Sequence, residues 1–79
     1  MSWNYRVIKH KGAPDGKNDW YAIHEVYYGK DHNVMWTINE IAPIGNNCLE
    51  LSKTLELMKI SLTKPVLVLD ESGELEGEE

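Results

Sequence analysis

Phenylalanine is absent from this chain, and no aromatic residue follows Trp36. The seven aromatic residues are all Trp or Tyr, each with a large apolar body and one polar tip. Such side chains suit half-exposed surfaces and interfaces better than a dry core. They are Trp3, Tyr5, Trp20, Tyr21, Tyr27, Tyr28 and Trp36. We therefore expect the N-terminal half of the protein to carry an aromatic surface as well as a small core.

Cysteine and long apolar runs are also scarce. Cys48 is the only cysteine among the 79 residues, which excludes an intrachain disulfide and favours a reducing compartment. No apolar run approaches the ~18 residues of a membrane span, and no charged-then-apolar leader opens the chain. We expect a cytoplasmic protein with no membrane partner. A chain of this length forms one domain with a thin core, which self-association commonly supplements.

Basic residues are absent from the last ten positions, which hold six of the thirteen acids. The segment 1–69 is near neutral, with seven acids and eight Lys and Arg. This balance gives little attraction to a phosphate backbone, so nucleic acid is not the expected partner. The acidic segment has no apolar period, and such composition is typical of disorder. We expect one domain at residues 1–69 and a disordered acidic tail at 70–79.

Three segments have strand patterns, at residues 3–9, 20–28 and 34–39. Loops separate them, at 10–19 and 29–33, so consecutive antiparallel pairing is expected. The second turn leaves two registers open. One pairs Tyr28 with Val34 and turns an alternating set of residues toward the core: Trp20, Ala22, His24, Val26 and Tyr28. The other turns the alternate set inward: Tyr21, Ile23, Glu25 and Tyr27. We favour the first, because burial of the Glu25 carboxylate in a thin core is costly.

One helix is predicted after the strands. Asn47 is suited to cap it, with Glu50 three residues on, as in a capping box. Apolar residues at spacings of three and four form one stripe, and Pro65 ends the helix. The stripe consists of Cys48, Leu51, Leu55, Met58 and Leu62, whereas three further apolar residues lie off it: Leu49, Leu57 and Ile60. The apolar run at 65–69 is expected to form either an edge strand or an extended strap.

The predicted fold class is α+β. It comprises a three-stranded antiparallel β-meander, one C-terminal α-helix packed on one face, a short extended segment and the disordered acidic tail. One helix covers one face of a sheet, so an aromatic sheet face is expected to stay uncovered.

Catalytic and metal-binding patterns are weak or missing. His24 and Glu25 are neighbours on a predicted strand, so their side chains point to opposite faces and do not form one acid–base pair. His10, His24, His32 and Cys48 lack the spacing of metal-ligand pairs. No phosphate loop, dinucleotide fingerprint or hydrolase elbow occurs. We predict no catalytic residue, no metal and no cofactor, and a small apolar role for Cys48 in the helix stripe.

Several segments resemble a family of small uncharacterised proteins from bacteria and their phages. In that family a Tyr-x-Ile-His-Glu-Val-Tyr-Tyr strand precedes a Trp-Thr strand, a Glu-rich helix and a Lys-Pro-Val-Leu end. The similar positions span about residues 3–67 and include Tyr21–Tyr28, Trp36-Thr37 and Lys64–Leu67. The chain departs from the family at His32, where Gly is usual, and at Asn47-Cys48, where Ser-Leu is usual. The resemblance implies no activity and no site residues.

The expected function is that of a small non-enzymatic protein-binding or regulatory module, such as an inhibitor associated with a phage or mobile element. Its partner would be another protein or a second copy in a homodimer. The expected interface residues are Tyr21, Ile23, Tyr27, Met35, Leu57 and Ile60. Two alternatives remain open: binding of single-stranded nucleic acid by the aromatic sheet, and a small oligomeric enzyme with His24 and Tyr residues at a subunit boundary.

Overall fold

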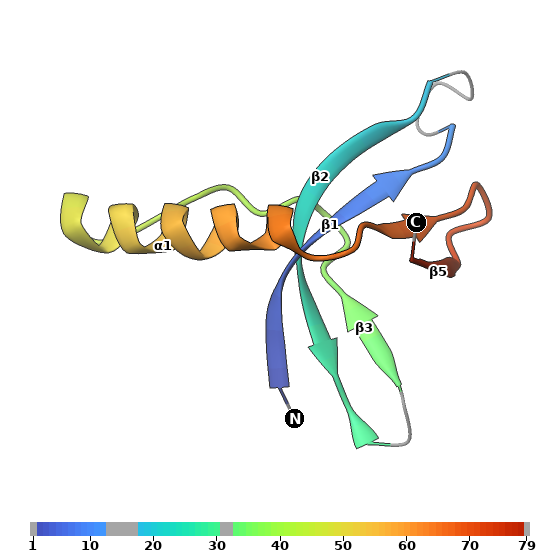
Figure 1. Ribbon diagram of the computed structural model, residues 1–79, viewed down its shortest axis with the longest axis horizontal. Coiled ribbons are helices and arrows are strands. Elements are labelled where there is room, and N and C mark those ends of the chain that lie inside the picture. The colour runs from blue at the N-terminus through green and yellow to red at the C-terminus, as the bar shows by residue number, and fades with distance from the viewer. Residues whose placement is uncertain (1, 13–17, 31–32, 79) are drawn as a thin grey trace.

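The sheet has five strands, three of which belong to the predicted meander. The computed structural model describes residues 2–12, 18–30 and 33–78. In chain order the elements are β1 (Ser2–His10), β2 (Trp20–Tyr28), β3 (Val34–Trp36), α1 (Cys48–Ile60), the short 3-10 helix η2 (Ser61–Thr63), β4 (Leu67–Leu69) and β5 (Leu75–Glu78). The strand order is β3-β2-β1-β4-β5, and the sheet is mixed because β4 runs parallel to β1. The strands curl into a half-barrel from which α1 projects (Figure 1).

Strand register follows the predicted pattern in the N-terminal half. β2 has the predicted bounds, and it pairs with all of β1, with Arg6 opposite His24. Tyr28 lies opposite Val34, which is the register that we favoured over its one-residue shift. His24 accordingly faces the core and is fully buried, whereas Glu25 is only half-buried. Residues 13–17 of the first predicted loop and His32 in the second lie outside the described residues.

The two faces of the sheet differ because the sheet curls. The inner face carries the core, in which Ile8, Val26 and Leu67 are buried. Partly buried apolar side chains from β2, β3, β4 and β5 pack against them: Tyr28, Val34, Trp36, Leu69 and Leu75. Residues on one face of a curled sheet approach one another across the curve, as they do in a barrel. The inner face is therefore covered by the sheet itself, and the outer face is left for α1.

The predicted fold, a three-stranded meander with one helix packed on a face and a disordered tail, is wrong. β4 extends the sheet beside β1, and residues 70–78 form a turn and β5 rather than a disordered tail. β4 and β5 are only three and four residues long, which is too short to show a clear alternation in the sequence, and β4 pairs with the distant β1. The half-barrel therefore depends on the pairing of β4 with β1 and β5, which the residue composition of these segments does not predict.

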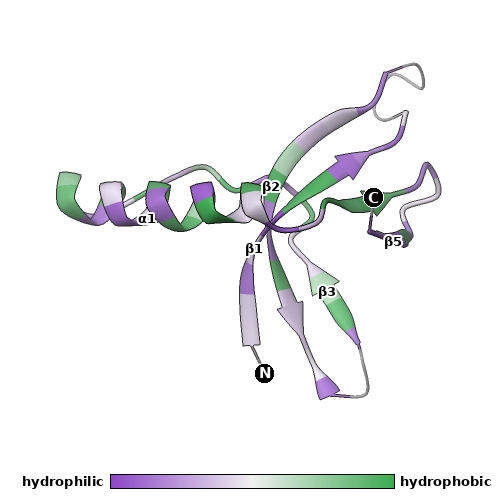
Figure 2. Ribbon diagram, in the orientation of Figure 1, coloured by the Kyte–Doolittle hydropathy of each residue, from purple (hydrophilic) through white to green (hydrophobic). Residues whose placement is uncertain are grey.

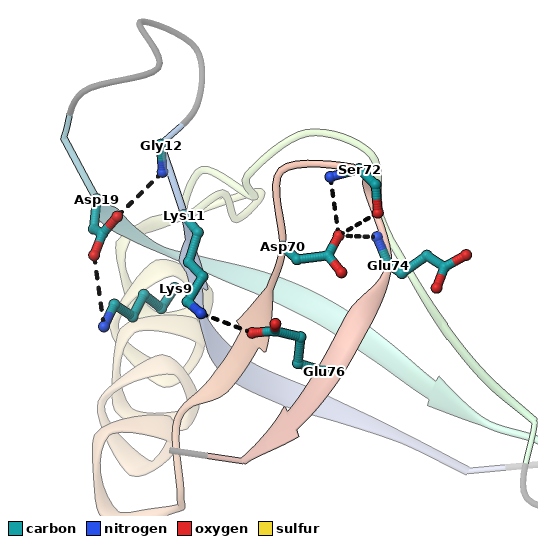
Figure 3. A network of polar contacts seen from close by, with 8 residues as sticks. All are labelled: Lys9, Lys11, Gly12, Asp19, Asp70, Ser72, Glu74 and Glu76. Atoms are coloured by element: carbon teal, nitrogen blue, oxygen red, sulfur yellow. Dashed lines mark hydrogen bonds and ion pairs between the residues drawn. The ribbon is translucent and has the colours of Figure 1, made fainter.

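Polar contacts order the acidic C-terminal segment (Figure 3). The Asp70 carboxylate accepts hydrogen bonds from the backbone N–H groups of Ser72 and Glu74 at 3.0 and 2.9 Å and from the Ser72 hydroxyl at 2.6 Å. Hydrogen bonds to its charged form, the Ser72 hydroxyl first, lower the pKa of Asp70. Lys11 Nζ lies 3.0 Å from a Glu76 carboxylate oxygen, and Arg6 pairs with Glu78 at 3.3 Å. These cations offset the mutual repulsion of the acids.

The helix forms as predicted, but it does not lie across a face of the sheet. Asn47 caps it, accepting a hydrogen bond from Glu50 N at 2.9 Å. Within α1 only Met58 is buried, so the apolar stripe does not pack as we expected: Leu55 is 48% exposed, and Leu62 in η2 is 69% exposed. The last turns contact β1, while the rest of α1 projects beside the 41–47 connector (Figure 1). The apolar residues of the inner face are buried by one another, so their burial does not require α1.

The projecting helix and its connector form an arm. Gly45 lies so close to the helix backbone that a Cβ atom there would be 2.5 Å from Leu51 N. The connector therefore packs directly on α1, and a side chain at Gly45 would separate the two. Apolar and polar residues alternate along the arm (Figure 2). Within the described residues, no helix is long and apolar enough to cross a membrane.

Candidate binding surface

An aromatic cluster lies on the outer face of the sheet, where β1 begins and β2 ends. Trp3 and Tyr5 share this face because they are two residues apart on β1, and Tyr27 is the cross-strand neighbour of Trp3. The Trp3 and Tyr5 rings meet edge to face, with centroids 5.2 Å apart, and the Trp3 and Tyr27 centroids are 6.3 Å apart. Trp3 remains 49% exposed. We call these three residues the aromatic cluster.

A groove separates the aromatic cluster from the end of α1. Its volume is about 340 Å³, and it is lined by Trp3, Asn4, Tyr5, Leu57, Ile60 and Lys64. Leu57 and Ile60 are 55% and 49% exposed. The lining is mainly apolar, and Lys64 is the one charged residue among the described residues that form it. We call this space the aromatic groove.

Two further hollows border other parts of the surface. One of about 460 Å³ lies on the opposite side of α1, lined in part by Ile23, Leu55 and Leu62. Another of about 520 Å³ lies between β3 and the β4–β5 hairpin, lined in part by Trp36, Ile38 and Leu69. Neither carries the paired aromatic rings of the aromatic groove among its lining residues.

The predicted interface residues are distributed over several surfaces. Tyr27 belongs to the aromatic cluster, whereas Leu57 and Ile60 line the aromatic groove. Ile23 and Met35 line the two other hollows, and Tyr21 is 54% exposed on the outer face. The prediction omitted Trp3 and Tyr5. Their two-residue spacing placed them on one side of the first strand, and a pairing of that strand with the second would have shown that they lie beside Tyr27.

A pair of buried histidines lies on the inner face. The Nε2 atoms of His10 and His24 are 2.9 Å apart. His24 Nδ1 lies 2.8 Å from the Thr37 carbonyl oxygen, which accepts only, so this nitrogen carries a proton. In neutral His24 the Nε2 atom then accepts, and His10 Nε2–H is the donor. The His10 ring stacks on Trp20 with centroids 3.9 Å apart.

Both histidines are buried, and this affects the pKa of His10. Burial, followed by repulsion from His24, lowers the pKa of His10, and Glu40 opposes this shift. Both rings are at least nine-tenths buried, and His24 has partners for both nitrogens. Among the residues that the structure describes, no cluster of three His, Cys, Asp or Glu side chains is placed to hold a metal ion. The two rings are therefore shielded from solvent and are held by each other, by the Thr37 carbonyl and by the Trp20 ring.

Arg6 joins four segments of the half-barrel. Its guanidinium donates to Tyr28 Oη at 3.0 Å and to the Pro65 carbonyl at 2.7 Å, and it reaches the Glu78 carboxylate at 3.3 Å. Tyr28 Oη donates in turn to Asn4 Oδ1 at 2.7 Å. Arg6 is 93% buried, so its charge stabilises the fold rather than attracting a ligand.

Two lysines, one in β1 and one directly after it, are paired with carboxylates. Lys9 lies 3.6 Å from Asp19, and Lys11 lies 3.0 Å from Glu76 (Figure 3). The Tyr27 hydroxyl donates a hydrogen bond to the Glu25 carboxylate, and this bond raises the pKa of Tyr27. A carboxylate therefore lies beside the aromatic cluster. Comparison of the chain with protein-family models, curated proteins and solved structures finds no match.

Proposed function

We propose that this chain is a small, non-enzymatic protein-binding module that acts through the aromatic groove. The observation that carries the proposal is that Trp3 and Tyr5 of the aromatic cluster, with Trp3 49% exposed, share one hollow with apolar residues of α1. Trp and Tyr anchors dominate the binding energy of many protein interfaces, and apolar pockets beside them receive the partner's own anchor. The family resemblance and the cytoplasmic location stay predictions.

The chemistry of the groove favours a particular kind of protein segment. Its apolar lining fits an aliphatic or aromatic side chain, and Lys64 at its border favours a carboxylate nearby. We therefore expect the bound segment to present one large apolar residue flanked by an acidic one. A regulator that occupies a surface of its target would need no catalytic group of its own.

Nucleic-acid binding has less support from the charges. Stacking proteins combine aromatic rings with cations that track the phosphates. Here Lys9 and Lys11 are paired with carboxylates, and Glu25 is hydrogen-bonded to a member of the aromatic cluster. The enzyme alternative also has little support, because His24 is fully buried and both its nitrogens are engaged.

Affinity capture with matched baits tests the proposal. The wild-type chain, a Trp3→Ser variant and an Ile38→Ser variant are used to capture proteins from the native host. Ile38 is 92% exposed away from the aromatic groove, so its variant controls for lost surface hydrophobicity. A protein retained by the wild type and Ile38→Ser, but lost by Trp3→Ser, is then purified and titrated by calorimetry. We expect at least ~10-fold weaker binding by Trp3→Ser, as for an aromatic hot spot.

Two results would contradict the proposal. One is a purified partner that binds wild type and Trp3→Ser equally. The other is tight binding of single-stranded RNA or DNA with a steep dependence on salt, which would favour the nucleic-acid alternative.

A further inference from the structure

One side of α1 lies opposite the buried Met58 and carries a stripe of mixed character, whose last member, Ile60, also borders the aromatic groove. Leu49, Lys53, Glu56 and Ile60 are spaced by four, three and four residues, which aligns them along the helix. We call them the outward stripe. All four are exposed, with Leu49 at 66% and Ile60 at 49%. Met58, which packs inward, is two residues from Ile60 and so lies about 200° around the helix from it.

The outward stripe is complementary to a second copy of itself that runs in the opposite direction. A two-fold axis across the helix, between Thr54 and Leu55, brings Leu49 level with Ile60 of a second copy. The same axis brings Lys53 level with Glu56 of that copy. Apolar residues thus meet at the two ends, and opposite charges meet twice in the middle. In a parallel arrangement Lys53 would meet Lys53 and Glu56 would meet Glu56, which is repulsive.

We infer that the outward stripe pairs with a second copy of this chain, with the two α1 helices antiparallel in a two-fold homodimer. A two-fold interface uses the same patch on both subunits, which is the property that the stripe has. The helix also needs packing against another surface to be stable. It has 13 residues, and isolated helices shorter than ~12–15 residues are marginally stable in water. Pairing supplies the packing that the sheet does not give to the projecting arm.

This dimer goes beyond the proposed function and uses a largely different surface, with Ile60 common to both. The stripe lies on the side of α1 opposite Met58. Because α1 projects from the sheet (Figure 1), two copies can pair through their arms without bringing their sheets together. The aromatic cluster remains accessible, although Ile60 borders both surfaces. Pairing of the arms would therefore present two aromatic grooves in one assembly.

Charge reversal within the outward stripe tests the pairing and its direction. The variants Lys53→Glu and Glu56→Lys each make both central contacts repulsive in a homodimer. We expect each to raise the dissociation constant of the dimer by about tenfold or more. The double variant Lys53→Glu/Glu56→Lys exchanges the charges and should recover self-association. An equimolar mixture of the two single variants should form a heterodimer. One chain then has two acidic residues at positions 53 and 56, and the other has two basic residues there.

The measurement is sedimentation velocity from about 1 to 500 µM, with circular dichroism to follow helix content. Glu74→Lys is the matched control, since it reverses one exposed charge in the turn before β5, away from α1. It should leave the dissociation constant unchanged. A wild-type chain that stays monomeric throughout this range overturns the inference. So does self-association that the single reversals leave intact, or a mixture that forms no heterodimer. The Trp3→Ser variant should lose partner binding but still form the dimer. It therefore tests the proposed function independently of the dimer.

Discussion

The curled sheet and the projecting arm use apolar residues in opposite ways. In the sheet, residues from distant strands converge, so Ile8 and Val26 are completely buried without help from the helix. In the arm, Leu49 and Leu57 are both more than half exposed, although the helix around them is well capped. The comparison indicates that the half-barrel is sustained by its own packing. The arm is regular in structure, but its apolar side chains are less completely packed than those of the sheet.

Truncation in the inner core should give the largest effect. Ile8→Ala removes a fully buried side chain at the centre of the sheet, which should lower the free energy of unfolding by about 2–5 kcal/mol. A domain of this size has only ~3–5 kcal/mol to lose from its core, so this variant should be largely unfolded. Ile38→Ala is the matched control, because Ile38 is 92% exposed and should change the free energy by less than ~0.5 kcal/mol. Urea denaturation measures both, and equal effects would refute the claim that the curl forms the core.

Removal of the Arg6 charge should give the next largest effect. Arg6→Met keeps much of the aliphatic stem but leaves the Pro65 carbonyl and the Glu78 carboxylate without their donor. We expect a loss of about 1–3 kcal/mol and faster amide exchange in β5. Lys11→Met removes the ion pair with Glu76, in which both side chains are nearly half exposed, and should cost less than ~1 kcal/mol. If the two variants are equally stable, Arg6 does not hold β4 and β5 to the sheet.

Loss of the helix cap should affect the arm more than the sheet. Asn47→Ala removes the acceptor for Glu50 N, which should cost the helix about 1 kcal/mol. Helix content measured by circular dichroism should fall, while tryptophan fluorescence from the sheet changes little. Asn46→Ala is the control, because only the backbone N–H of Asn46 takes part in its hydrogen bond to Glu50. A sheet that unfolds together with the uncapped helix would contradict the independence of the two regions.

Burial of His10 should give a small dependence of stability on pH. The pKa of His10 is lowered in the folded protein from its usual 6.5, so the unfolded chain binds the proton more readily. Stability from this group is complete above about pH 6.5 and declines as the pH falls below that value. Asp70 has the same sign at lower pH, because its pKa is lowered from 3.8 and its contribution is lost only as the pH falls below that value. Urea midpoints at pH 5.0 and 7.5 should therefore differ in the wild type, and the difference should shrink in His10→Gln. An unchanged difference would show that His10 is not responsible.

Local patterns in the sequence were enough to predict part of the fold and of the candidate site. The alternation of residues 20–28 predicted β2 and, with the cost of burying Glu25, its register to β3. Asn47 and Glu50 predicted the start of the helix, because capping involves neighbours along the chain. The exposure of Leu57 was also foreseeable, since it lies off the apolar stripe, but its position beside Trp3 was not.

The sequence by itself determined the three N-terminal strands and the start of the helix, because side-chain alternation and capping depend on residues near one another along the chain. Only the tertiary structure decided that the sheet curls, that β4 joins β1 in parallel and that an acidic segment becomes β5. Those outcomes depend on Arg6, Lys11 and Leu75 meeting residues far away in sequence. Once the inner face had closed on itself, α1 was left to project, and its apolar residues remained on the surface.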